Sequence, residues 1–117
     1  MAKYETRLRG NFNSLVNWME QGILRGSESA SLEDGSDFDV NGVRCSVRVF
    51  ERYSMIGSNR VSLTIVIFGY GEELVFTAIA AGGSQAVLFK INTIGEETFL
   101  QKAIQVLEEF RRSGQGY

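Results

Sequence analysis

The sequence predicts an α+β protein in which one curved, largely antiparallel sheet of about five to six strands carries two helices on one face. Three observations lead to this prediction. A strand pattern and then a helix pattern occupy the first 26 residues, two turn signals divide the middle into hairpins, and a long amphipathic helix pattern follows. The 117 residues, 44% of them hydrophobic, show no repeat or linker, so we expect a single two-layer domain over residues 1–117.

The first strand and the first helix are both read from periodicity. Residues 3–9 alternate charged with less polar side chains, as a half-buried strand does, and Gly10 ends the pattern. Asn11 or Asn13 can cap the helix that follows. Its apolar residues recur at the three- and four-residue spacing of one helical face: Phe12, Leu15, Val16, Met19 and Ile23. We expect Gly26 to end this helix in a left-handed conformation.

The next segment contains two turn signals of unequal strength. Residues 27–33 form a weak strand candidate, and Asp34-Gly35 after them is predicted as a tight turn. Asn41-Gly42 is the stronger signal, because a type I′ turn needs positive φ at both central residues. This turn places Val40 opposite Val43 and sorts the hairpin into two faces. We expect one face in the core, with Phe38, Val40, Val43, Cys45, Val47 and Val49, and the other in solvent, with Asp37, Asp39, Arg44, Ser46 and Arg48.

Three arginines recur at every fourth position of the second hairpin strand: Arg44, Arg48 and Arg52. Guanidinium groups in a row suit phosphate or carboxylate ligands. The alternative is a salt-bridged face, because Asp39 lies opposite the first of these arginines and Asp37 is diagonally within reach. We favour the salt-bridged interpretation. Phe50 lies on the same face and indicates a bulge or cover by another element.

Residues 60–81 are predicted as a second hairpin that turns at Tyr70-Gly71. A two-residue loop puts Ile67 opposite Leu74 and gathers eight apolar residues on one face: Val61, Leu63, Ile65, Ile67, Leu74, Phe76, Ala78 and Ala80. A three-residue loop would put Glu73 and Thr77 there instead, so we prefer the first. The opposite face is also partly apolar, with Val66, Phe68, Val75 and Ile79. Such a face usually packs against something.

The glycine-rich segment Gly82-Gly83-Ser84-Gln85 is either an anion-binding nest or a bend between strands. A phosphate loop should lead into a helix, whereas residues 86–91 are typical of another short strand, which favours the bend. A capping box from Thr93 to Glu96 then opens the last helix. Its apolar arc is unusually wide: Phe99, Leu100, Ala103, Ile104, Val106, Leu107 and Phe110.

The composition argues against several function classes. The chain has no histidine and a single cysteine, Cys45, which leaves no Ser-His-Asp triad and no metal-ligand cluster, so we expect no metal, no cofactor and no enzyme activity. Cys45 itself is expected to be buried and inert. The formal charge of −2 and the absence of a long apolar run argue against nucleic-acid and membrane partners. Lacking an apolar leader and a second cysteine, the chain is expected in the cytoplasm.

A resemblance adds to this reading. The run from Ala80 to Gln85, then Phe89-Lys90, and Gly95-Glu96-Glu97 before Phe99-Leu100 resemble a family of small bacterial proteins known only as a domain of unknown function. The similarity covers nearly the whole chain. It implies no activity and no catalytic residue. The order of elements, with a C-terminal helix against the sheet, is also similar to helix-grip and TATA-binding-protein-like folds, and such an analogy does not give function.

We therefore expect a non-enzymatic interaction module. Its second sheet face, around Val66, Phe68, Val75 and Ile79, would bind another copy in a homodimer or an unknown protein partner. The alternative is a binding protein for a small apolar or anionic ligand, with a cavity between the sheet and the C-terminal helix. The residues at the mouth of that cavity would be Gly82, Gly83, Ser84, Arg44 and Arg48. Acid/base chemistry by a carboxylate or by Tyr53 or Tyr70 is a third hypothesis, which no residue spacing supports.

Overall fold

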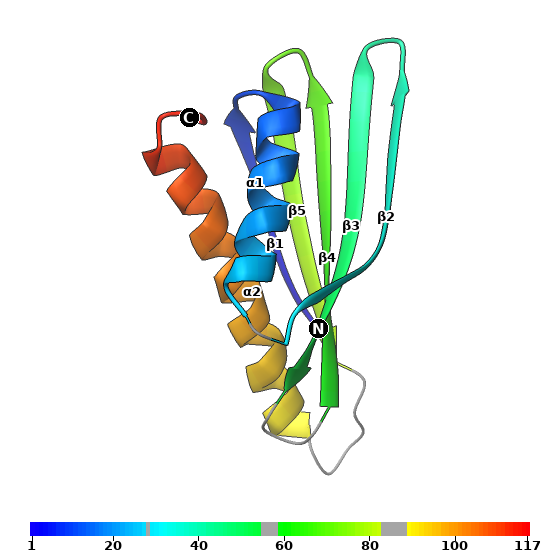
Figure 1. Ribbon diagram of the computed structural model, residues 1–117, viewed down its shortest axis with the longest axis vertical. Helices are drawn as coiled ribbons and strands as arrows, with labels where there is room; N and C mark the ends of the chain where they lie inside the picture. The colour runs from blue at the N-terminus through cyan, green and yellow to red at the C-terminus, as the bar shows by residue number, and fades with distance from the viewer. Residues whose placement is uncertain (28, 55–58, 83–88) are drawn as a thin grey trace.

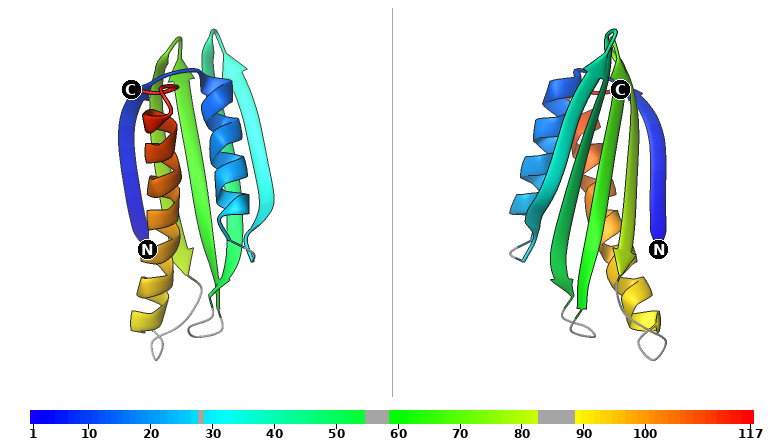
Figure 2. Two further views of the ribbon diagram at one scale, coloured as in Figure 1. Left: turned by 60° about the vertical axis from the view of Figure 1, so that its left-hand side comes forward. Right: turned by 90° about the vertical axis from the view of Figure 1, so that its right-hand side faces the viewer.

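The computed structural model describes residues 1–27, 29–54, 59–82 and 89–117, with side chains described for all of these except residues 54, 59 and 89–94. Its elements are β1 (Ala2–Arg9), α1 (Phe12–Arg25), β2 (Ser31–Val40), β3 (Val43–Ser54), β4 (Asn59–Tyr70), β5 (Glu73–Gly82) and α2 (Phe89–Arg112). The α+β prediction is confirmed. One antiparallel sheet of five strands, in the order β1-β5-β4-β3-β2, carries both helices on the same face (Figures 1 and 2).

Helix α1 begins and packs as its sequence predicts. Asn11 is extended, with φ of −86° and ψ of 126°, and its side chain accepts a hydrogen bond of 2.9 Å from the Ser14 amide. All five residues of the predicted apolar face are buried. The end of the helix differs, because Gly26 has right-handed φ and ψ of −80° and −6°. A Cβ there would lie 1.9 Å from Cε of Lys102 on α2, near the end of a flexible side chain that can move aside.

The first hairpin confirms one predicted turn and corrects the other. Asn41 and Gly42 have φ of 52° and 83°, and Val40 pairs with Val43 as expected. Asp34-Gly35 is not a turn, because β2 runs through it with a shift of register between Leu32 and Asp34. Gly35 has a different role. A Cβ there would lie 3.0 Å from Cδ of Arg48 on β3, so glycine leaves room for the arginine.

The second hairpin turns one residue later than predicted. Tyr70 pairs with Glu73 and Ile67 with Phe76, so the register differs by two residues from the expected one. Gly71, with φ of 60°, supplies the positive φ that the first central position of a type II′ turn requires. Because side chains alternate faces with a period of two, a slip of two changes no face. The eight apolar residues predicted to share one face are all buried.

Helix α2 is longer than the capping box predicts. It begins at Phe89, so Thr93 lies inside it, and residues 89–91 are helical where a strand was expected. The other half of that expected strand, residues 86–88, lies outside the described residues. Short apolar runs do not distinguish strand from helix by periodicity, which explains the error. Towards its end, α2 packs on α1: Trp18 donates from Nε1 to the Val106 carbonyl at 2.9 Å.

The prediction of which hairpin face is buried is wrong. Phe38 and Val40 are 56% and 65% exposed, whereas Ser46 and Phe50 are 1% and 0% exposed. The cause lies in the pairing of β3 with β4, which places Phe50 beside the core residue Leu63. The arginine-bearing face of β3 therefore lies under the helix layer, and the valine-bearing face points away from it.

Candidate interaction surface on the open face of the sheet

The sheet face that the helices leave uncovered is called here the open face. It carries the predicted interface residues Val66, Phe68, Val75 and Ile79, and the hairpin adds Phe38, Val40, Val43, Cys45, Val47 and Val49. The register places these side chains in rows across the strands. One row runs Phe38, Cys45, Phe68, Val75 from β2 to β5. The open face is thus a continuous apolar surface over four of the five strands, larger than the sequence indicated.

On one side the apolar rows end on a charged edge strand, β1. On β1 the open face carries Lys3, Glu5, Arg7 and Arg9, each in the same row as an open-face residue of β5. Glu5 accepts a hydrogen bond of 2.7 Å from the Thr77 hydroxyl, which ties this edge to β5. A shallow pocket of about 360 Å³ lies at the corner nearest the β4–β5 turn. Its lining includes two of these arginines and three aromatic rings: Arg7, Arg9, Phe68, Tyr70 and Tyr117.

Cys45 lies on the open face and not in the core as expected. It is a free thiol of intermediate exposure. Burial by its neighbours raises the pKa of this thiol, so the protonated form is favoured. Its place in the row with Phe68 makes it a chemical probe of whatever covers this face.

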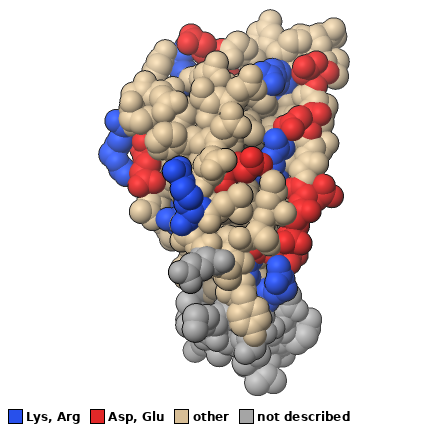
Figure 3. All heavy atoms as spheres, in the orientation of Figure 1, with Lys and Arg blue, Asp and Glu red and all other residues tan. Residues whose placement is uncertain are grey.

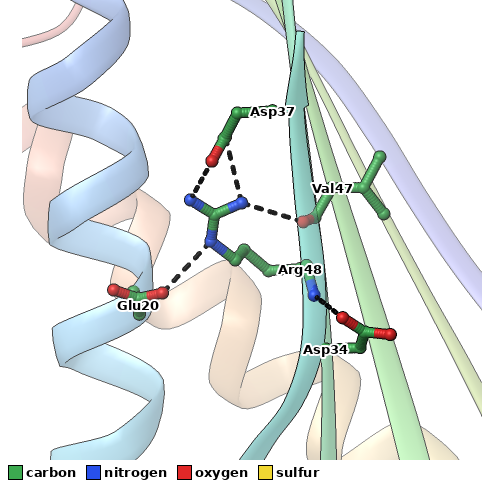
Figure 4. A network of polar contacts seen from close by, with 6 residues as sticks. Glu20, Asp34, Asp37, Val47 and Arg48 are labelled. Carbon is green, nitrogen blue, oxygen red and sulfur yellow. Dashed lines mark hydrogen bonds and ion pairs between the residues drawn. The ribbon is translucent and has the colours of Figure 1, made fainter.

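On the opposite face, Arg48 is held in a polar network (Figure 4). Its two terminal nitrogens donate to the Asp37 carboxylate at 3.0 and 2.9 Å, and Nε donates to Glu20 on α1 at 3.1 Å. The guanidinium lowers the pKa of Asp37, and that carboxylate in turn raises the pKa of Arg48. The salt-bridged interpretation therefore holds for Arg48, which fastens β2 to α1 and β3.

The other two arginines of this series stack on aromatic rings. The guanidinium carbon of Arg44 lies 4.4 Å from the ring centre of Phe12, and that of Arg52 lies 4.4 Å from the ring centre of Phe99. Burial lowers the pKa of Arg52. Within the described residues Asp39 makes no ion pair with Arg44, although the two are paired in the register. A groove of about 380 Å³ between α1 and the β2–β3 hairpin is lined by Phe12, Asn13, Val16, Asn17, Asp37, Arg44 and Arg48.

The residues predicted at a ligand cavity do not all come together. Arg44 and Arg48 line the same groove. Gly82 is the last residue of β5 and aligns through Val61 with Arg52. Along β3, Arg52 is eight residues from Arg44, about 26 Å, so Gly82 and Arg44 belong to different ends of the sheet. Gly83 and Ser84 lie outside the described residues.

Charge is distributed unevenly around this fold. In Figure 3, acidic side chains gather on the side where Figure 1 places β2, with basic side chains between them. Within the described ranges, no group of three or more Cys, Asp or Glu residues is arranged to hold a metal ion. Across that same part of the chain, neither helix combines the length and the apolar character that crossing a membrane requires.

Comparison with known proteins identifies a family whose function is unknown. Neither a curated protein nor a solved structure matches the chain, so the analogy to helix-grip and TATA-binding-protein-like folds stays a prediction. A family model described as a family of unknown function, DUF6054, matches residues 1–111. The chain therefore belongs to the DUF6054 family.

Proposed function

We propose that this protein is a non-enzymatic interaction module that forms a homodimer through the open face of its sheet. The observation that carries the proposal is the continuous apolar surface over β2, β3, β4 and β5 on the side without helices. Phe68 is 45% exposed at its centre, and Phe38 is 56% exposed towards its edge. Large contiguous apolar surfaces of this kind mark interaction sites on soluble proteins.

The size of the open face fits a second copy of the chain. Five strands about 4.8 Å apart and roughly ten residues long span about 24 Å by 33 Å, or roughly 800 Å². A stable interface of standard size buries about 800 Å² on each partner. Two sheets packed face to face, about 10 Å apart, would interdigitate these valine and phenylalanine side chains as a β-sandwich does. We place the protein in the cytoplasm, where the free thiol of Cys45 stays reduced.

The mass of the protein in solution tests this proposal. Val75→Asp puts a charge into the proposed interface, and Phe68→Ser removes an exposed ring without adding charge, so at least one variant should keep the fold. Gln105→Asp on the exposed side of α2 is the matched control. We expect dimers for the wild type and the control by sedimentation velocity, and monomers for the two open-face variants with unchanged circular dichroism. A monomeric wild type at about 100 μM, or dimeric folded variants, would refute the proposal.

A specific observation favours a second candidate function, the binding of a small anion in the groove between α1 and β3. Arg44 projects there beside the amides of Asn13 and Asn17, and stacking on Phe12 fixes its guanidinium without neutralising it. Asp37 also lines the groove, and Arg48 compensates its charge. A preorganised guanidinium and amide donors suit a carboxylate or phosphate group.

Thermal unfolding with inorganic phosphate and with citrate tests this second candidate. A bound anion at about 100 times its Kd stabilises the folded state by roughly 2.7 kcal/mol. We expect a rise in Tm that Arg44→Gln abolishes and that Arg25→Gln, at the exposed end of α1, preserves. Equal shifts in both variants would indicate a general salt effect and would exclude the groove as the site.

A further inference from the structure

We infer that the two copies pack about a two-fold axis that runs along β4, so that β1 of each copy lies over β2 of the other. The inference rests on the proposed function and adds the orientation of the partner. It is carried by the charges on the two edge strands. β1 contains Lys3, Arg7 and Arg9 against the single acid Glu5. β2 contains no basic residue, and the acid on its open face is Asp34, because Asp37 and Asp39 lie on the side of the helices.

A two-fold axis in the interface can run along the strands or across them. An axis along β4 leaves β4 over itself and exchanges the outer strands, so β5 lies over the partner's β3 and β1 over its β2. An axis across the strands places each strand over its own copy. The basic β1 strands would then face each other, and each Asp34 would lie over the partner's β2 and not over a basic strand. Opposed like charges disfavour an interface and opposite charges steer and orient it, so the first arrangement is favoured.

The rows of the register then determine which residues of the two copies face each other. The row with Val49 runs from Asp34 on β2 to Lys3 on β1. Rotation about β4 keeps each row on itself, so Lys3 faces the partner's Asp34, and the same pair recurs on the other side of the axis. Lys3 is exposed and reaches over the surface on a long flexible stem. Two symmetric ion pairs therefore close the two margins of the interface.

The centre of the interface is apolar in the same arrangement. In the row that contains Cys45, Val75 faces the partner's Cys45, and Phe68 on the axis faces the partner's Phe68. Two rings brought together on an axis form an aromatic pair that adds to the area buried. Ile79 faces the partner's Val49 in the row of the ion pair. The Lys3–Asp34 pairs thus lie at the margins, where Arg7 also faces the partner's Phe38, and apolar residues lie at the centre, as in stable interfaces.

Disulfide trapping tests the orientation with the native cysteine. Within one chain, Cys45 and Val75 lie two strands apart, about 10 Å, too far for a disulfide, whereas across the proposed interface they face each other. We expect Val75→Cys to give a covalent dimer on mild oxidation, reversed by dithiothreitol. Val47→Cys is the matched control, with one added cysteine on the same face. It faces the partner's Thr77 in the proposed arrangement, and only an axis across the strands brings it near the partner's Cys45.

A charge exchange provides the second measurement. Lys3→Asp and Asp34→Lys each replace two attractive contacts in the dimer with repulsive ones, so each should raise the dimer Kd roughly tenfold. The double variant restores opposite charges and should return the Kd to within about threefold of the wild type. A double variant as weak as the sum of the single variants would overturn the orientation.

The outcomes separate the two proposals. A dimer in solution that is trapped by Val75→Cys and not by Val47→Cys supports both. A dimer trapped by Val47→Cys alone, or by neither variant, overturns the orientation and leaves self-association in place. A wild type that stays monomeric overturns the proposed function, and the orientation falls with it.

Discussion

Replacing Gly22 by alanine measures how closely the two helices approach each other. An added Cβ would lie 2.4 Å from Cγ1 and 3.2 Å from Cγ2 of Val106, where ordinary contact begins at 3.4 Å. Overpacking of this kind costs about 1–3 kcal/mol. Alanine in a helix interior regains up to about 1 kcal/mol over glycine, so we expect a net loss of about 1 kcal/mol, or roughly 4 °C in Tm.

Urea unfolding followed by circular dichroism, at one fixed protein concentration, measures this loss. The control repeats the substitution after Val106→Ala, which removes both γ-carbons that the new Cβ meets. In that background Gly22→Ala should stabilise, because only the helix propensity remains. If Gly22→Ala stabilises the wild type as well, the helices do not approach as closely as described, and the reasoning fails.

Three further predictions follow from contacts on either side of the sheet. Arg48 lowers the pKa of Asp37, so the stability from this carboxylate is present above its unfolded pKa near 3.8 and is lost as pH falls through the lower folded value. Asp37→Asn should therefore reduce the acid-dependent drop in the free energy of unfolding, measured with urea between pH 6 and pH 2, by less than about 1 kcal/mol because the carboxylate is 59% exposed. Burial raises the pKa of Cys45, so a thiol reagent at pH 7.5 should label it more slowly than a free thiol, and still more slowly as protein concentration rises; equal rates would contradict its placement. Gly69→Ala would bring a Cβ within 2.8 Å of Cδ2 of Phe12 and should lower the free energy of unfolding by about 1–3 kcal/mol, whereas an unchanged Tm would show that the ring moves aside freely.

Local signals in the sequence were sufficient for most of the elements. The apolar face of α1 and the Asn41-Gly42 turn depend on residues close to one another in the chain, and each forms as predicted, while of the two predicted caps, Asn11 and Asn13, it is Asn11 that caps α1. The observed β4–β5 register differs by two residues from the predicted one, yet every side chain lies on the predicted face. A change of two residues keeps the face because side chains alternate between the two faces of a strand. Binary pattern thus predicts the core of a hairpin better than it predicts the turn.

The wrong face of the first hairpin has a non-local cause. Composition favoured the valine-rich face as core, whereas pairing with β4 decides which face meets the helices. One signal was present: Phe50 stands among the polar residues of the arginine face, and it is the fully buried one. The arginines were also taken to indicate a solvent-exposed face. A guanidinium group can instead stack on an aromatic ring at the border of the core, as that of Arg44 does on Phe12.

The wrong assignment of the buried face of the first hairpin also limited what could be predicted of the candidate site. Val66, Phe68 and the two β5 residues were identified because the second hairpin is apolar on both faces. The contribution of β2 and β3 was missed, since their valines had been assigned to the core. Arg44 and Arg48 were predicted at a ligand cavity beside the C-terminal helix, but the position of their groove against α1 could not be predicted, because it depends on where α1 crosses the hairpin.

The attachment of β1 has a consequence for how the chain folds. Strands β2 to β5 each pair with their neighbour in sequence, whereas β1 joins the sheet only through β5, with Glu5 bonded to a residue 72 positions away. Closing so long a loop is slow compared with forming local hairpins. The four-strand meander should therefore assemble first and β1 should dock last. In native-state hydrogen exchange, the β1 amides should lose their protection before those of β4, at the centre of the sheet.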